Sequence, residues 1–88
     1  MNTRINEYKD KFVFHPGYYI EEMIDESKIT LDEFAYSLGT TSEILRRVVK
    51  GEQRVSVDLA EKLSCMFGTT TAFWLNLQRS WDEVVVRI

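Results

Sequence analysis

The stretch that decides the fold is residues 30–50, TLDEFAYSLGTTSEILRRVVK. Its apolar and small residues recur at helical spacing on both sides of Gly39, which predicts two short helices joined by a tight turn. A glycine at the turn can take a positive backbone φ without steric cost. The side chains expected to face inward are Phe34, Ala35, Leu38, Leu45 and Val48. The pattern therefore predicts a helix-turn-helix unit.

Proline, glycine and capping residues mark the boundaries of three further helices. His15-Pro16-Gly17 precedes a first helix that ends near Lys28, and Ser56 and Thr70 are suitable N-caps for two later helices. Residues 83–88 are mostly β-branched, so they could form a short C-terminal strand or a frayed extension. We expect an all-α fold of five helices. The four helices after the first are expected over residues 31–38, 42–50, 57–67 and 71–82.

Length and composition indicate one small globular domain. We expect an N-terminal segment at 1–14, the helix-turn-helix domain at 15–82 and a C-terminal extension at 83–88. No run approaches the roughly 18 apolar residues of a membrane span, and the N-terminus lacks a signal-sequence pattern. A single cysteine cannot form an internal disulfide. We therefore expect a cytoplasmic protein without a membrane partner.

The net charge of −3 is distributed unevenly along the chain. Residues 42–54 contain four basic and two acidic side chains, a local charge of +2, whereas residues 17–41 carry a local charge of −5. Binding to DNA depends on the electrostatic field at the docking face rather than on the total charge. A basic patch on an acidic body is therefore compatible with DNA binding.

The predicted helix over 42–50 has a basic outer face opposite its core-facing residues. Arg46 lies at the centre of this face and could donate two hydrogen bonds to a guanine, while Glu43 could accept from a cytosine or deter the wrong sequence. The other basic residues lie toward the edges, where phosphate contacts are expected, and Ser42 or Thr41 could bond a base edge or a phosphate. An ordinary solvated face is the alternative, but the complete helix-turn-helix pattern favours DNA recognition. The expected DNA-binding residues are Thr41, Ser42, Glu43, Arg46, Arg47, Lys50 and Arg54.

The predicted fifth helix is more apolar than one small domain can bury. Phe73, Trp74 and Leu77 share a broad arc that can seal the core, whereas Leu75 points almost the opposite way. Either Leu75 is a single exposed leucine, or this helix mediates self-association. Aromatic clusters are typical of interface centres, which favours a two-fold homodimer. The expected dimer-interface residues are Trp74, Leu75, Gln78 and Trp81.

The sequence contains no recognisable catalytic, cofactor-binding or metal-binding set, so we do not expect an enzyme. The only histidine, His15, stands beside Pro16 and is expected at a helix start or in packing. His15 and Cys65 are 50 residues apart and give little support for a zinc site or a Cys-His nucleophile.

An acidic cluster lies on the predicted first helix. Hard cations need loop geometry and carbonyl oxygens, which a regular helix does not offer. The cluster is therefore either a solvated face or a docking face for a basic protein. Its residues are Glu21, Glu22, Asp25 and Glu26, and the first three are the expected contacts for a basic partner.

The most specific motif of the chain is FWLNLQ at residues 73–78. It follows a series of short motifs that begins at residue 15: His15-Pro16-Gly17, Glu21-Glu22, Phe34-Ala35, Leu38-Gly39, Val48-Val49 with Gly51, Asp58-Leu59-Ala60, Leu63 and Gly68-Thr69. In order and spacing, residues 15–82 resemble the HigA-type antitoxins, a branch of the Cro and lambda-repressor (XRE) helix-turn-helix family.

This resemblance implies a five-helix, lambda-repressor-like fold, a homodimer and binding to a palindromic operator in double-stranded DNA. It also implies a cognate toxin of the HigB type, an mRNA-cleaving ribonuclease. The chain would then neutralise the toxin by direct binding and repress its own operon. A stand-alone repressor without a toxin partner is the alternative, and a protein-interaction module that has lost DNA binding is a weaker one.

Overall fold

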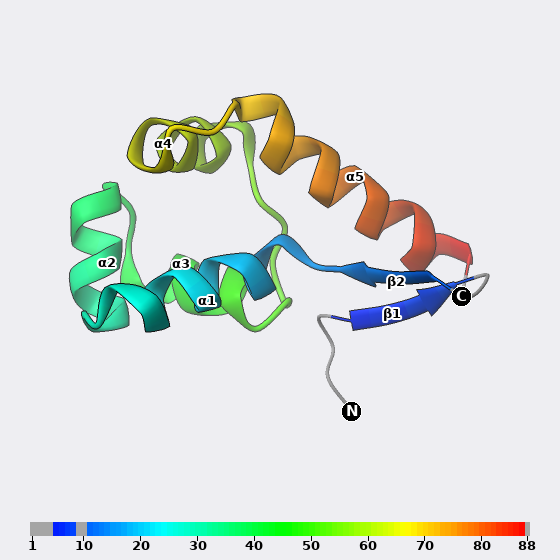
Figure 1. The fold of residues 1–88 in the computed structure, drawn as a ribbon, viewed down its shortest axis with the longest axis horizontal. Coiled ribbons are helices and arrows are strands. Elements are labelled where there is room, and N and C mark those ends of the chain that lie inside the picture. Colours follow the sequence, from blue (N-terminus) through cyan, green and yellow to red (C-terminus); the bar gives the residue numbers. More distant parts are fainter. Residues whose placement is uncertain (1–4, 9–10, 88) are drawn as a thin grey trace.

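The computed structural model describes residues 5–8 and 11–87, which form a helical body and a β-hairpin beside its last helix (Figure 1). Five helices are present in the described residues, as the sequence predicts. The order of elements is β1 (Ile5–Tyr8), β2 (Lys11–Phe14), α1 (Pro16–Ser27), α2 (Leu31–Leu38), α3 (Ser42–Val49), α4 (Val57–Phe67) and α5 (Thr71–Arg87).

Local capping sets the boundaries of the helix-turn-helix unit. The hydroxyl of Thr30 accepts from the amide of Glu33, and the Glu33 carboxylate accepts from the amide of Thr30, both at 3.0 Å. Hydrogen bonding to the Glu33 carboxylate, first from the backbone N–H of Thr30 and second from its side chain, holds the pKa of Glu33 below its ordinary value. At the other end of α2, Gly39 has φ 88° and donates its N–H to the carbonyls of Ala35 and Tyr36. The turn thus uses the positive φ that a glycine accepts without strain.

The core lies where α1, α2, α3, α4 and the first half of α5 meet. Trp74, Leu45 and Leu63 are completely buried there. Phe34 on α2 stacks against Phe67 on α4 with ring centroids 5.7 Å apart. All five residues expected to face inward around the turn are buried: Phe34, Ala35, Leu38, Leu45 and Val48.

The start of α1 packs unusually closely on the end of α3. His15 caps α1, because its Nδ1 accepts from the amide of Gly17 at 2.9 Å, and its ring meets the edge of Trp81 at 5.3 Å. This confirms the expected helix-start and packing role of the histidine. A Cβ on Gly17 would overlap the carbonyl oxygen of Val48 and lie 3.0 Å from Cα of Val49. Only glycine fits this crossing without a backbone shift.

The N-terminal segment contains a hairpin that the sequence reasoning did not anticipate. β1 pairs antiparallel with β2, in a register that sets Ile5 opposite Phe14 and Tyr8 opposite Lys11. Both strands contact α5, β2 more extensively than β1.

Residues 83–87 form neither the short strand nor the frayed extension that the sequence left open, because α5 continues as a helix through them. Val84 is buried and Val85 is exposed, so packing on one side of the helix overrides the preference of β-branched residues for strands. Residue 88 lies outside the described residues. In the described part of the chain, no helix combines the length and apolar character needed to cross a membrane.

Candidate nucleic-acid interface

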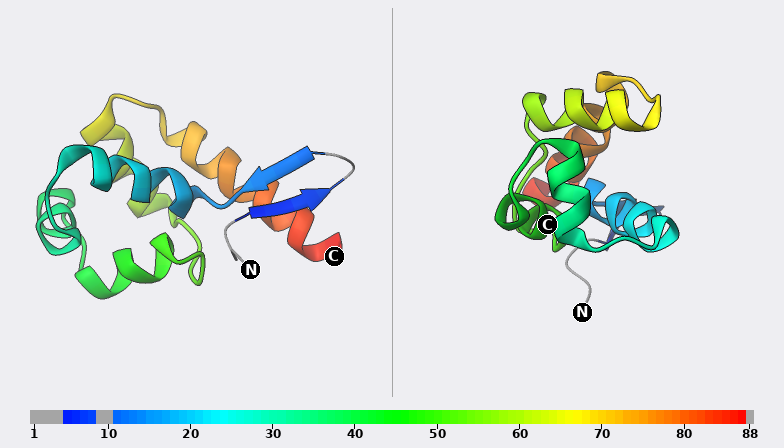
Figure 2. Two further views of the ribbon diagram at one scale, coloured as in Figure 1. Left: turned by 60° about the horizontal axis from the view of Figure 1, so that its bottom comes forward. Right: turned by 90° about the vertical axis from the view of Figure 1, so that its left-hand side faces the viewer.

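Helix α3 lies at the margin of the helical body, with one side open to solvent (Figure 2). Leu45, Val48 and Val49 anchor its inner side in the core. Thr41 starts the helix, because its Oγ1 accepts from the amide of Ile44 at 3.1 Å. The side chains predicted to contact DNA are exposed except for Ser42, which is half-buried; they are Thr41, Glu43, Arg46, Arg47, Lys50 and Arg54.

Two arginines of α3 form solvent-exposed ion pairs. Arg47 pairs with Glu43, one helical turn earlier, and Arg46 lies 3.8 Å from the carboxylate of Asp32 on α2. Exposed pairs of this kind contribute about 0–1 kcal/mol. A phosphate or a guanine edge can therefore replace either acidic partner at small cost. These pairs also orient both guanidinium groups on the outer side of the helix-turn-helix unit.

Arg54 stands apart from α3, on the connection to α4, and is paired with Asp82 of α5 at 2.8 Å. The sequence reasoning placed Arg54 among the phosphate contacts but missed Asp82, since the two residues are far apart along the chain.

The predicted dimer residues are found mainly inside the subunit, and this corrects the expectation for three of them. Trp74, Gln78 and Trp81 are buried within the chain. Trp74 belongs to the core, Gln78 accepts from the amide of Val55 on the connection between α3 and α4, and Trp81 packs against His15. Leu75 is half-buried and packs against the same core. Helical spacing identified an apolar surplus on α5, but it could not show how much of the surplus the other helices cover.

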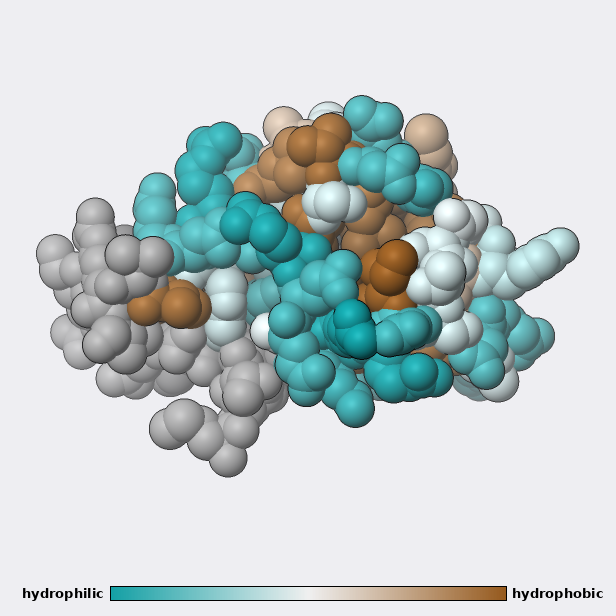
Figure 3. Space-filling view, turned by 180° about the vertical axis from the view of Figure 1, so that it is seen from behind, coloured by the Kyte–Doolittle hydropathy of each residue, from teal (hydrophilic) through white to brown (hydrophobic). Residues whose placement is uncertain are grey.

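The apolar side chains that do remain exposed are dispersed. Tyr36 on α2 is 88% exposed and Val85 near the end of α5 is 47% exposed. Figure 3 shows a mixed surface on the face seen from behind, with hydrophobic residues gathered in its upper middle part. Met66 on α4 and Ile44 on α3 are also exposed.

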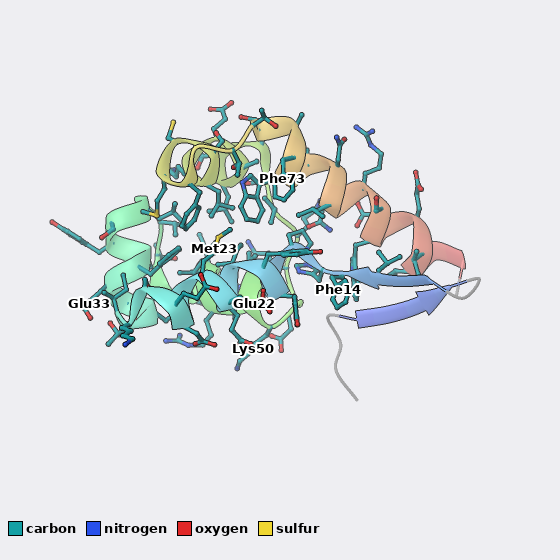
Figure 4. The ribbon with its side chains drawn as sticks, viewed as in Figure 1. Phe14, Glu22, Met23, Glu33, Lys50 and Phe73 are labelled. Atoms are coloured by element: carbon teal, nitrogen blue, oxygen red, sulfur yellow. The ribbon has the colours of Figure 1, made fainter. Side chains whose placement is uncertain are left out.

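The acidic cluster lies on α1, on a different helix from the residues of α3 that are predicted to contact DNA. Glu22, Asp25 and Glu26 are exposed, whereas Glu21 is half-buried. In Figure 4, Glu22 on α1 and Glu33 on α2 both point away from the helical core. Glu22 and Asp25 of the predicted acidic face are therefore accessible to a partner, whereas Glu21 is less accessible.

Known proteins with similar sequences include helix-turn-helix transcriptional regulators. The HTH-type transcriptional regulator YddM of Escherichia coli is 35% identical over 67 residues, which cover 76% of this chain and 71% of that protein. Virulence-associated protein A' of Dichelobacter nodosus is 35% identical over 69 residues, which cover 77% of this chain but only 60% of that protein. The chain thus spans about three fifths of the second relative. No family model matches the chain.

Solved structures with the same fold include antitoxins. An addiction module antidote protein of the HigA family from Coxiella burnetii has a TM-score of 0.76 and 32% identity, with 82% of this chain and 79% of that chain covered. The Pseudomonas aeruginosa antitoxin HigA, solved with the higBA promoter, has a TM-score of 0.78 and 27% identity, with 83% and 80% covered. The chain therefore belongs to the HigA-type antitoxins, within the helix-turn-helix transcriptional regulators.

Proposed function

We propose that this chain is the DNA-binding antitoxin of a type II toxin–antitoxin module. It binds a palindromic operator as a homodimer and represses its own operon, and it neutralises a ribonuclease toxin of the HigB type by direct contact. The observation that carries the DNA-binding part is the solvent-facing side of α3, where Arg46 and Arg47 project from a helix fixed by three buried residues. The P. aeruginosa antitoxin HigA, solved with the higBA promoter, supports DNA binding by a protein of this fold.

The outer side of α3 fits the major groove by its chemistry. A recognition helix needs base-reading groups at its centre and phosphate-binding groups at its margins. Arg46 has the central position, and its loose pair with Asp32 leaves the guanidinium available for a guanine. Arg47 and Lys50 follow it toward the end of α3, and Arg54 lies on the connection to α4; all three are exposed and suit phosphates.

The first prediction separates these two roles. Arg46→Ala should cost about 1–3 kcal/mol per half-site and relax discrimination at one base pair. Lys50→Ala should weaken binding to all sequences alike and reduce the slope of log Kd against log salt by about one. Titrations of duplexes from the promoter region, each mutated at one base pair, measure both effects. Unchanged discrimination in Arg46→Ala would rule out base reading by this residue.

The toxin-binding part of the proposal concerns the acidic face of α1, defined by Glu22 and Asp25. A carboxylate cluster close to DNA lowers affinity by repulsion, so its presence is better explained by a second, basic partner. Such a partner would also associate faster with an acidic surface at low salt. Glu21 was predicted to belong to this face, but its half-buried position makes it less suitable for a test.

The second prediction tests this face by charge reversal. The double variant Glu22→Lys, Asp25→Lys should slow association with the toxin by about tenfold at low salt, while operator binding stays equal or becomes slightly tighter. The matched control is Glu61→Lys, Glu83→Lys, which reverses two exposed charges on α4 and α5. Growth on co-expression with the toxin measures toxin neutralisation, and a DNA-shift assay on the same proteins measures operator binding.

Two outcomes distinguish the parts of this proposal. Full growth rescue by the α1 variant, equal to that of the control, would exclude α1 as the toxin surface. Failure of the unmodified chain to bind the product of any neighbouring gene, together with specific operator binding, would instead identify a stand-alone repressor.

A further inference from the structure

The connection between α3 and α4, residues 50–56, is attached to α5 at two consecutive residues. The first attachment is buried: the amide of Val55 donates to Oε1 of Gln78 at 2.8 Å, and the Gln78 side chain is only 2% exposed. A buried amide without a partner would destabilise the fold, so this bond fixes the path of the connection. Gln78 therefore holds the connection between α3 and α4 against α5 within the subunit.

The second attachment involves a carboxylate that is itself held in place. Asp82 lies one helical turn after Gln78, and its Oδ1 accepts from Nε2 of Gln78 at 3.0 Å. Its other oxygen, Oδ2, accepts from Nη2 of Arg54 at 2.8 Å. Both oxygens of Asp82 are thus engaged. Arg54 is oriented by a chain of bonds that begins at a buried glutamine.

Arg54 keeps hydrogen-bonding capacity for a further partner. Its side chain is 66% exposed, against 37% for Asp82. A guanidinium has five N–H donors in a planar fork, so a bond to Asp82 leaves other donors for a phosphate. An arginine that is already oriented also loses less side-chain freedom when it meets that phosphate.

We propose that Asp82 is a positioning residue for DNA binding, which holds Arg54 in the orientation that contacts a phosphate beside α3. Gln78 supports this arrangement by fixing both Asp82 and the connection. The proposal rests on the DNA-binding function proposed above. It makes α5 part of the DNA-binding apparatus, although this helix is separated from the helix-turn-helix unit along the chain.

Electrostatics alone predicts the opposite sign for loss of Asp82. A carboxylate near DNA repels phosphates, so its neutralisation should tighten binding. If Asp82 positions Arg54, neutralisation should weaken binding instead. The sign of the change therefore separates the two explanations.

The test uses Asp82→Asn in the complete chain. This change keeps an oxygen that can accept from Gln78 but removes the charge that pairs with Arg54. Kd is measured against salt on a duplex of the protein's own promoter region and on a mixed-sequence duplex of equal length. Asp82→Asn should weaken binding about fivefold on both duplexes and reduce the salt slope by about one, because one phosphate contact is lost. The matched control, Asp58→Asn, removes an equal charge from an exposed pair with Lys62 on α4 and should leave Kd unchanged or slightly lower.

A double-mutant cycle with Arg54→Ala keeps the test decisive even if Asp82→Asn lowers thermal stability. If Asp82 acts through Arg54, the double variant should bind no more weakly than Arg54→Ala alone. Additive losses, or tighter binding by Asp82→Asn, would overturn the positioning role while leaving DNA binding intact. Absence of salt-dependent binding by the unmodified chain on either duplex would overturn the DNA-binding function itself.

Discussion

Gly17 is the residue at which the smallest change should have the largest effect on the fold. In most helices, replacing glycine by alanine stabilises by about 0.5–1 kcal/mol, because the unfolded chain loses freedom. Here a Cβ would overlap the carbonyl oxygen of Val48 and would lie 2.9 Å from its carbonyl carbon. The steric effect should outweigh the propensity gain, because the obstacle is backbone and cannot rotate away.

We therefore predict that Gly17→Ala destabilises the protein by about 1–3 kcal/mol, the usual cost of forcing extra atoms into a packed interior. Gly68→Ala is the matched control: its φ of 72° adds backbone strain, but nothing lies within 4 Å of the added Cβ. Urea unfolding of both variants gives the comparison. A Gly17→Ala variant as stable as the unmodified chain would show that α1 can shift away from α3 at little cost.

Single residues also show where sequence reasoning about the site reached its limit. The position of Arg46 on the outer side of α3 follows from the helical period alone, and the structure places it there. The role of Gln78 could not be obtained in the same way, because its partner is a backbone amide 23 residues earlier. Periodicity describes which side of a helix a residue occupies, but it does not identify the element that covers that side.

At the scale of elements, the predictable helices are those with local signals at both ends. α2 has a capping box at its start and a glycine in the left-handed conformation at its end, and α4 has Ser56 and Gly68 in the same roles. Their bounds were predicted correctly, since these signals act within a few residues. α5 has no such stop signal near residue 82, and its helix extends to Arg87.

The hairpin was missed for a related reason. A two-stranded hairpin is marginal by itself, so its formation depends on the surface against which it packs. That surface is α5, which begins 57 residues after the end of β2. The same contact accounts for the extra length of α5, because the hairpin covers a helix end that would otherwise fray. The formation of the hairpin and the extension of α5 thus depend on the same tertiary contact. Local sequence signals cannot predict such a contact.

At the scale of the whole molecule, the charged surfaces divide between two elements. The basic side chains of α3 and the acidic side chains of α1 belong to helices that pack directly on one another. This arrangement gives a small chain of net charge −3 two faces of opposite character. A DNA duplex and a basic protein could then be bound by different faces, which is what an antitoxin that also represses its operon requires.

Binding to a palindromic operator requires two copies of α3 in a fixed relation, so the last prediction concerns the dimer. Burial of Trp74, Gln78 and Trp81 removes the centre of the interface first expected on α5. Two large apolar side chains of this helix remain exposed, Phe73 at 41% near its start and Val85 at 47% near its C-terminal end, and Val85 is the more exposed of the two. Leu75→Glu would be a less direct probe, because Leu75 also packs against the core.

We predict that Val85→Glu shifts the protein toward monomer and weakens binding to the full operator more than binding to a single half-site. The reason is that two linked half-sites act together only when the subunits are joined, and this can raise apparent affinity by about 10²–10⁴. Tyr36→Glu is the matched control, since it places the same charge on an 88% exposed aromatic position of α2. Sedimentation velocity reports the oligomeric state. Titration of full and half operators reports the gain in affinity that comes from joining the two subunits. If Val85→Glu sediments as the unmodified protein does, the two-fold contact lies outside the C-terminal end of α5.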